Sequence, residues 1–280
     1  MNPSSVTVDE LLEVALRAAA AGAAVLAVRD PAGFAATEKS SDADWVTAFD
    51  VAAENAVRAV IADARPHDVI TGEELAPALP PEQSGYRWSI DPLDGTMNFI
   101  RNIAYYGTSV AVMGPDGEWL AGVVNAPALR RIYFASLGGG AWLDETRADG
   151  VQSVRQLHGP VEKRGGTLLS TSLSYDTDVR RRLVSELDSR MDHFGDVRRL
   201  GSAALELCGV ADGSVDAYLE YGLFEHDFAA GGLIAEEAGA WVHRPVLSPA
   251  INGLPTREEV LSVWTAACVP GLEDGFAPAE

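Results

Sequence analysis

The spacing of apolar residues predicts two amphipathic helices near the start of the chain. Thr7 and Glu10 form the pattern of a capping box, and the apolar positions after them recur at helical spacing to about Val28. A second helix is predicted from near Thr47, with apolar residues every three or four positions until Pro66 stops it. The acids of this second helix are expected to form its solvated face: Asp50, Glu54 and Asp63.

The pattern then changes to short β runs that are broken by turn residues. Residues 108–113, 119–125 and 131–136 alternate or are continuously apolar, which predicts an antiparallel meander. Gly138-Gly139-Gly140 follows the third run. It lacks the Gly-Lys-Ser/Thr of a phosphate loop, so we interpret it as a hairpin turn.

The last part of the chain has a different rhythm. Beyond residue 166, short apolar runs alternate with helical patterns, which favours a mostly parallel sheet with helices packed against it. Residues 144–165 are polar and rich in Gly, Arg and Asp. We therefore expect two parts. Residues 1–150 would carry the N-terminal helices and an antiparallel sheet, and residues 151–280 a C-terminal α/β part.

The clearest chemical feature follows an apolar run that begins at Trp88. Asp91 and Asp94 stand on either side of Pro92-Leu93, and Gly95-Thr96 comes next. Because Asp is depleted in strands and Pro cannot donate to a ladder, the strand is predicted to stop at Asp91. Amides at a helix start suit an anion, so the segment predicts metal ligands beside a phosphate cradle. An ordinary solvated turn is the alternative.

Two more acids occupy comparable positions. Glu73 follows the apolar run Val69-Ile70, so two strands end in acids that could share one site. Asp227 stands before an Ala/Gly/Leu-rich run that is predicted to be a helix to Glu237, where its alternative role is capping.

These motifs resemble the inositol monophosphatase family of magnesium-dependent, lithium-sensitive phosphatases. Residues 88–101 match the first signature of that family at every position, and the resemblance runs from about residue 10 to about residue 268. It implies an α/β (α+β) fold, the layered αβαβα sandwich of the inositol monophosphatase and fructose-1,6-bisphosphatase type. It also implies two or three Mg²⁺ ions, with these ligands: Glu73, Asp91, the Leu93 carbonyl, Asp94 and Asp227.

The resemblance also implies catalytic and substrate-binding roles. Lys39 and Asp44 match the family element Lys-x-x-x-x-Asp-x-Val-Thr, whose Asp pairs with the Thr of the first signature to orient the attacking water. The catalytic residues would then be Asp44, Thr96 and Glu73. The implied substrate-binding residues are Lys39, Gly95, Thr96, Gly201, Ser202, Ala203 and Glu220, the last at the position that contacts inositol hydroxyls.

One departure concerns the residue before the last metal-binding Asp. The family usually has Trp or another bulky apolar residue there, whereas this chain has Glu225-His226. The ligand itself is intact, so activity is expected. We expect Glu225 and His226 to make the cleft wall more polar, and His226 to have a structural or a catalytic role.

Composition narrows the choice of function. The 280 residues include 21 Lys and Arg against 41 Asp and Glu, a net charge of −20, which disfavours nucleic acid as a partner. Clustered carboxylates can still recruit divalent cations, whose charge inverts the local field for a phosphate. The two cysteines give neither zinc spacing nor a disulfide framework. The early apolar stretch 18–28 is too short to span a bilayer, so we expect no membrane partner and a cytoplasmic location.

The function implied is a Mg²⁺-dependent phosphomonoesterase acting on a small phosphorylated polyol, above all inositol monophosphate, as a homodimer. Histidinol-phosphate phosphatase of the same superfamily is the nearest alternative, and a nucleotide 3′-phosphatase is a weaker one. A haloacid-dehalogenase-type phosphatase requires Asp-x-Asp, and here two residues separate the aspartates. A non-catalytic regulatory partner is the alternative from a different class.

Overall fold

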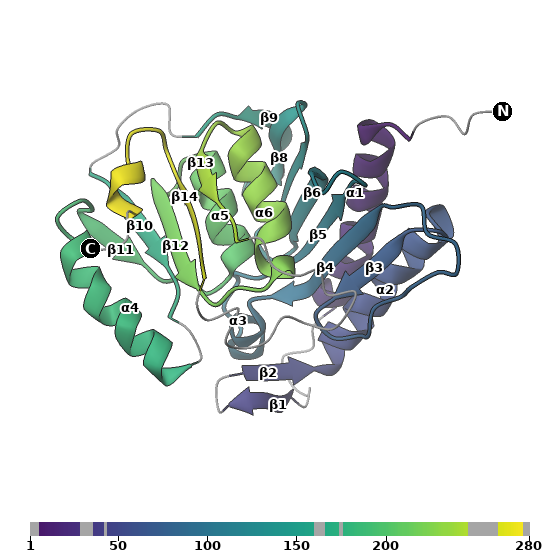
Figure 1. Cartoon of the computed structure of the whole chain (residues 1–280), viewed down its shortest axis with the longest axis horizontal. Helices are drawn as coiled ribbons and strands as arrows, with labels where there is room; N and C mark the ends of the chain where they lie inside the picture. Colours follow the sequence, from purple (N-terminus) through teal and green to yellow (C-terminus); the bar gives the residue numbers. More distant parts are fainter. Residues whose placement is uncertain are drawn as a thin grey trace.

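The computed structural model describes residues 6–28, 36–41, 44–159, 166–173, 176–245 and 263–276. Figure 1 shows their elements in layers: two N-terminal helices, a large sheet, a central helix pair, a smaller sheet and an outer helix. This confirms the αβαβα sandwich. The helices are α1 (Val8–Ala27), α2 (Ala48–Ala64), α3 (Thr96–Arg101), α4 (Thr177–Arg190), α5 (Ala203–Asp212) and α6 (Glu225–Glu237), with a short 3-10 turn at Glu273–Phe276.

The first layer begins as the sequence predicted. The Thr7 hydroxyl accepts from the Glu10 amide at 3.2 Å, and the Glu10 carboxylate accepts from the Thr7 amide at 2.8 Å, so the capping box is confirmed. The apolar faces of α1 and α2 pack together and against one face of the larger sheet, in a cluster that includes Leu11, Val57 and Trp88. None of the described helices is long and apolar enough to span a membrane.

The larger sheet has seven strands in chain order: β3 (Val69–Gly72), β4 (Arg87–Asp94), β5 (Gly107–Met113), β6 (Trp119–Ala126), β7 (Arg131–Ser136), β8 (Gly140–Thr146) and β9 (Gln152–Leu157). The strands β4 to β9 pair antiparallel, which confirms the meander predicted for β5, β6 and β7, whereas β3 and β4 are parallel. The turn at Gly138–Gly140 joins β7 to β8. The edge strand β9 was not expected, because most of its side chains are polar and exposed, and it extends the sheet beyond the predicted boundary at residue 150.

The smaller sheet has the order β11-β10-β12-β14-β13, built from β10 (Leu168–Thr171), β11 (Asp196–Arg198), β12 (Ala217–Tyr221), β13 (Trp241–His243) and β14 (Trp264–Cys268). The strands β11, β10 and β12 are parallel, but β14 runs antiparallel to both of its neighbours. Four of the five strands therefore run in the same direction, as the prediction of a mostly parallel sheet required, and β14 is the exception. Alternation of strands and helices indicates that a strand is present, but it does not fix its direction.

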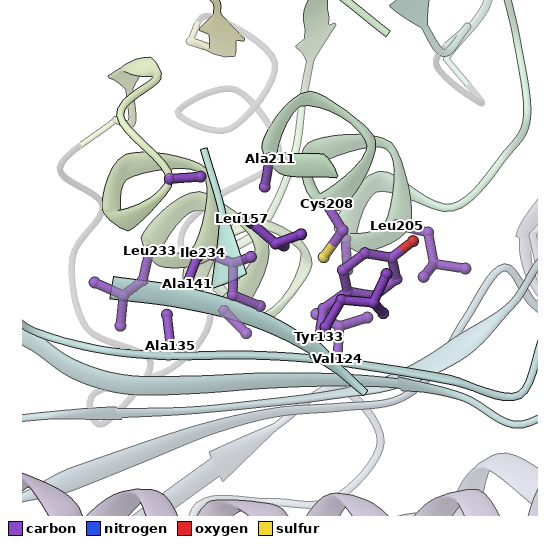
Figure 2. Packing of buried hydrophobic residues seen from close by; sticks show 14 of the residues in the cluster. Val124, Tyr133, Ala135, Ala141, Leu157, Leu205, Cys208, Ala211, Leu233 and Ile234 are labelled. Atoms are coloured by element: carbon purple, nitrogen blue, oxygen red, sulfur yellow. The ribbon is translucent and has the colours of Figure 1, made fainter. Parts of the chain in front are cut away.

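Helices α5 and α6 fill the space between the two sheets (Figure 1). Figure 2 shows their contact with the larger sheet, where Cys208 of α5 lies over Tyr133 and Val124, and Leu233 of α6 lies over Ala135. Burial raises the pKa of the Cys208 thiol well above its usual value, so this cysteine is a packing residue. Packing between the two sheets thus holds α5 and α6 in place. Both helices begin beside the end of β4.

Candidate active site

The end of β4 carries the central acids. All eight residues of β4 are buried, and the strand continues to Asp94, with a register shift between Asp91 and Asp94. The predicted strand end at Asp91 was therefore wrong. Pro92, which has no amide hydrogen, sits in the irregular segment, and its carbonyl accepts from the Thr108 hydroxyl at 3.0 Å. The irregularity lets both acids and the intervening Leu93 carbonyl belong to one short segment.

Four predicted acids and one histidine come together here from β4, the loop after β3 and the first turn of α6. One trio is Asp91, Asp94 and Asp227, and a second is Glu73, Asp91 and His226. Within each trio, one potential ligand atom per residue lies within 4.8 Å of the others. Asp91 belongs to both trios, as expected of a carboxylate shared between two cations.

Asp94 is held by the N-terminus of α5. Its carboxylate accepts from the Ser202 hydroxyl at 2.6 Å, from the Ala204 amide at 2.7 Å and from the Ala203 amide at 3.3 Å. Ser202 is also the N-cap of α5. The groups of Ser202 and Ala203 that were expected to bind substrate therefore position a carboxylate of the cluster.

Asp227 both caps α6 and faces the cluster. Its Oδ2 accepts from the Phe224 amide at 2.6 Å, and α6 begins at Glu225, two residues earlier than predicted. The Arg87 guanidinium forms a two-pronged ion pair with the Glu225 carboxylate, one arm of which measures 2.9 Å. Glu225 is thus paired with the Arg87 side chain of β4, and this ion pair holds the first turn of α6 against the strand that bears Asp91.

Thr96 has a carboxylate partner that was not predicted. Its hydroxyl lies 3.2 Å from Oδ1 of Asp50 and 3.1 Å from the Leu93 carbonyl. Asp44 was expected in that place. The backbones of Lys39 and Asp44 belong to the paired strands β1 (Ala36–Ser41) and β2 (Asp44–Thr47), but their side chains lie outside the described residues.

The acids Asp50 and Glu54 are fully buried, so the prediction of a solvated face on α2 was wrong for both, whereas Asp63 is exposed as expected. A signal was present in the sequence. Asp50 and Glu54 share the helical face of the buried Val57 and Ile61, at spacings of four, three and four residues. This face packs over the site, and its polar positions point to Thr96 and to the loop after β3.

Glu54 holds the loop that carries Glu73. Its carboxylate accepts from the Glu74 amide at 2.7 Å and pairs with Arg58, whose guanidinium also donates to carbonyls of the same loop. Gly72 permits this approach, because a Cβ there would lie 2.3 Å from a Glu54 oxygen. The Glu73 amide in turn donates to the Ile90 carbonyl at 3.2 Å, which joins the loop to β4.

The segment before α5 is fixed from two sides. The Asn98 side chain of α3 donates to the Leu200 carbonyl at 2.8 Å, and the Glu206 carboxylate accepts from the amides of Leu200 and Gly201 at 2.8 and 2.7 Å. Gly95, which precedes α3, has φ of 96°, and a Cβ there would lie 2.9 Å from the Tyr105 carbonyl and 3.3 Å from the Gly201 carbonyl. The Gly-Thr turn therefore lies close to the Gly201 segment, as a shared substrate site requires.

Glu220 is buried in β12 and accepts from the Tyr218 hydroxyl at 2.6 Å. Burial raises the pKa of the Glu220 carboxyl well above its usual value, and the charges of Glu206, Asp227 and Asp94 act in the same direction. Glu220 thus lies within the electrostatic reach of Asp227 and Asp94.

The cluster is electrostatically costly without a cation. Burial, followed by the charges of Glu73, Asp94 and Asp227, raises the pKa of Asp91 well above its usual value. Burial and Asp227 raise the pKa of Asp94 to about 8, although its bonds to Ser202 and Ala204 act in the opposite direction. Converging carboxylate oxygens are the donor set that hard divalent cations prefer, so the residues fit the implied metal.

The layered αβαβα sandwich and the acid cluster at the end of β4 together define a class of metal-binding phosphatases. Residues 7–261 match the Inositol monophosphatase family, and the chain belongs to that family. The protein is accordingly a phosphatase that hydrolyses phosphate monoesters.

Individual relatives agree with this membership. The chain is 39% identical over 245 residues to the inositol-1-monophosphatase of Mycobacterium bovis, which covers 86% of this chain and 79% of the relative. It is 36% identical over 239 residues to the Nus factor SuhB of Pasteurella multocida, which covers 84% and 85%. The extragenic suppressor protein suhB of Bartonella henselae has a similar structure, with a TM-score of 0.79, 25% identity and coverage of 96% and 99%.

Proposed function

We propose that this protein is a Mg²⁺-dependent phosphomonoesterase that hydrolyses a small phosphorylated polyol, with inositol monophosphate as its principal substrate. The observation that carries the proposal is the pair of ligand trios that share Asp91, with the buried Glu220 in electrostatic reach. The name of the Mycobacterium bovis relative, inositol-1-monophosphatase, supports the substrate. We further propose that the enzyme is a lithium-sensitive cytoplasmic homodimer, which the resemblance to the family implies.

The residues that would hold two or three Mg²⁺ ions are Glu73, Asp91, the Leu93 carbonyl, Asp94 and Asp227. When bound, Mg²⁺ supplies positive charge that stabilises phosphoryl oxygens and favours ionisation of water. The protein contributes placement. Asp94 is fixed by α5, Asp227 by its cap on α6 and Glu73 by the Glu54-bound loop.

The Thr96 hydroxyl would orient the attacking water. Its proton points to Asp50 or to the Leu93 carbonyl, and when Asp50 accepts it, the Thr96 oxygen is left to accept a hydrogen bond from water. Asp50 therefore takes the role that the sequence prediction gave to Asp44. Asp44 itself would act from the β1–β2 pair, which Figure 1 shows close to α3.

Substrate binding would involve the first turn of α3 and the segment before α5. The amides of Gly95 and Thr96 would hold phosphate oxygens, and Lys39 would add positive charge beside them. Gly201 would border the polyol, whose hydroxyls would donate to Glu220. Because the transition state of monoester transfer is loose and anionic, such positioning accounts for most of the catalysis.

The test is phosphate release by the purified protein from inositol phosphates, histidinol phosphate, sugar phosphates and an aryl phosphate, with Mg²⁺ and with EDTA. We expect Mg²⁺-dependent release that is fastest with an inositol monophosphate. The Glu220→Gln variant should lose several-fold activity on that substrate, as the roughly 1–3 kcal/mol of a charged hydrogen bond implies, while the aryl phosphate is cleaved almost as before. Preference for histidinol phosphate would overturn the substrate proposal, and absence of any release would favour a non-catalytic role.

A further inference from the structure

His226 lies where its imidazole can reach the acid cluster. It occupies the first turn of α6, directly before Asp227, and its side chain is more than nine-tenths buried. Its ring stacks on Phe224 with centroids 5.6 Å apart and an interplanar angle of 10°. This stacking fixes the plane of the imidazole, so its edge, which carries the nitrogens, has a defined direction.

That edge faces carboxylates. One ring nitrogen of His226 lies within 4.8 Å of carboxylate oxygens of Glu73 and Asp91, and its Nε2 lies 3.9 Å from Oδ1 of Asp227. Among the described residues, no hydrogen bond reaches the imidazole, although the ring is buried. A buried imidazole that lacks such a partner and is directed at converging carboxylates has the arrangement of a metal ligand.

We propose that His226 is a nitrogen ligand to the cation held by Glu73 and Asp91, and that it makes this position selective for a transition-metal dication such as Mn²⁺ over Mg²⁺. Imidazole binds first-row transition metals well, whereas Mg²⁺ prefers oxygen ligands and retains its water. A site with one imidazole and two carboxylates therefore binds Mn²⁺ more favourably than Mg²⁺. The trio of Asp91, Asp94 and Asp227 contains oxygen donors alone and remains suited to Mg²⁺.

This inference rests on the metal-binding part of the proposed function, and it is tested by binding alone. Mn²⁺ is the probe, because electron spin echo spectroscopy of protein-bound Mn²⁺ detects hyperfine coupling to a directly bound ¹⁴N nucleus. We expect nitrogen coupling in the unaltered protein. The His226→Phe variant keeps an aromatic ring for stacking on Phe224 but removes both nitrogens, so the coupling should disappear.

Affinity provides the second measurement. In calorimetric titrations, His226→Phe should bind Mn²⁺ about tenfold more weakly at one site. Tenfold is the lower end of the loss of metal affinity found when groups around a bound metal are substituted. Its affinity for Mg²⁺ should change much less. His158→Phe makes the same chemical change at an exposed position and should retain both the coupling and the affinity. Thermal unfolding of each variant without metal checks that the fold is intact.

The outcomes separate this inference from the proposed function. Absence of nitrogen coupling in the unaltered protein, or coupling that persists in His226→Phe, would overturn the assignment even if the enzyme is an active Mg²⁺-dependent phosphatase. Conversely, His226-dependent coupling in a protein that releases no phosphate would keep the assignment and remove the proposed function.

Discussion

The acids of β4 and the acids of α2 belong to the same site, yet the sequence reveals them very differently. Asp91 and Asp94 interrupt an apolar strand, where a carboxylate has no structural reason to be. Asp50 and Glu54 lie on an amphipathic helix, where acids are common and usually solvated. Both pairs are buried. The comparison shows that a polar residue is informative when its position contradicts the local pattern, and inconspicuous when it conforms to the pattern.

The two regions also differ in what they are built to do. The β4 acids accept hydrogen bonds that position their oxygens, and burial together with the charges of neighbouring carboxylates raises the pKa of both carboxyls. The α2 acids act on other parts of the site: Asp50 on Thr96 and Glu54 on the loop of Glu73. We therefore expect substitutions in the first region to remove metal-dependent chemistry, and substitutions in the second to reduce it or to weaken the fold.

The largest effect is expected from Asp94→Asn. The change removes charge from a proposed cation ligand with little change of shape, and the loss of several kcal/mol of transition-state stabilisation corresponds to about a 10³-fold fall in turnover or more. Steady-state kinetics with saturating Mg²⁺ measure it. Asp63→Asn, the same change on the exposed side of α2, is the matched control and should leave turnover unaltered. An Asp94→Asn enzyme with more than about a tenth of the original turnover would contradict the ligand assignment.

The next effect distinguishes two aspartates of the N-terminal region. Asp50→Asn should lower kcat by about 10²-fold with little change in KM, because the acceptor of the Thr96 proton is weakened and general base catalysis contributes on that scale. Thr96→Ala should behave similarly. Asp44→Asn is predicted to have a clearly smaller effect on kcat. If Asp44→Asn is the more severe change, the original pairing of Asp44 with Thr96 is restored.

A third effect concerns stability. Glu54→Gln removes the charge that Arg58 and the loop amides bind, so we expect a loss of about 1–3 kcal/mol in the free energy of unfolding. Urea denaturation without metal measures the change, and Asp63→Asn should stay within about 0.5 kcal/mol of the original. Equal stability of the two variants would mean that the buried position of Glu54 does not support the loop.

The last effect is a pH dependence of the stability of the metal-free protein. Folding raises the pKa of Asp94 from its ordinary value near 4 to about 8. Between these values the folded state holds a proton that the unfolded state has released, so stability falls as the pH rises from about 4 to about 8. The melting temperature should decline by roughly 2–4 °C for every kcal/mol lost. This decline in melting temperature with pH should be shallower in Asp94→Asn. Added Mg²⁺ should oppose it, most strongly near pH 8. A steeper decline in Asp94→Asn than in the original protein would contradict the prediction.

Much of the fold followed from local patterns. The capping box of α1 and the meander from β5 to β7 were both predictable, because each rests on short-range periodicity and turn chemistry. The direction of β14 was not, since strand orientation depends on pairing between segments distant in the chain. The edge strand β9 was hidden by its polar side chains, which an exposed edge tolerates.

Some residues of the site were likewise predictable from local sequence, and others were not. Glu73, Asp91, Asp94 and Asp227 could be predicted because each stands near the end of a strand or the beginning of a helix. Asp50 could not be chosen over Asp44 from residue types, because only the packing of α2 against α3 and β4 decides which carboxylate reaches Thr96. Likewise, the sequence placed His226 beside a ligand, but only the fold shows that its ring faces Glu73 and Asp91.

The most direct test of the account is a crystal structure grown with Mn²⁺ and read by anomalous scattering. The account predicts strong peaks on both sides of Asp91, one bounded by Glu73 and the other by Asp94 and Asp227. An active crystalline enzyme with no peak in contact with Asp91 would contradict the central claim that the end of β4 is the metal centre.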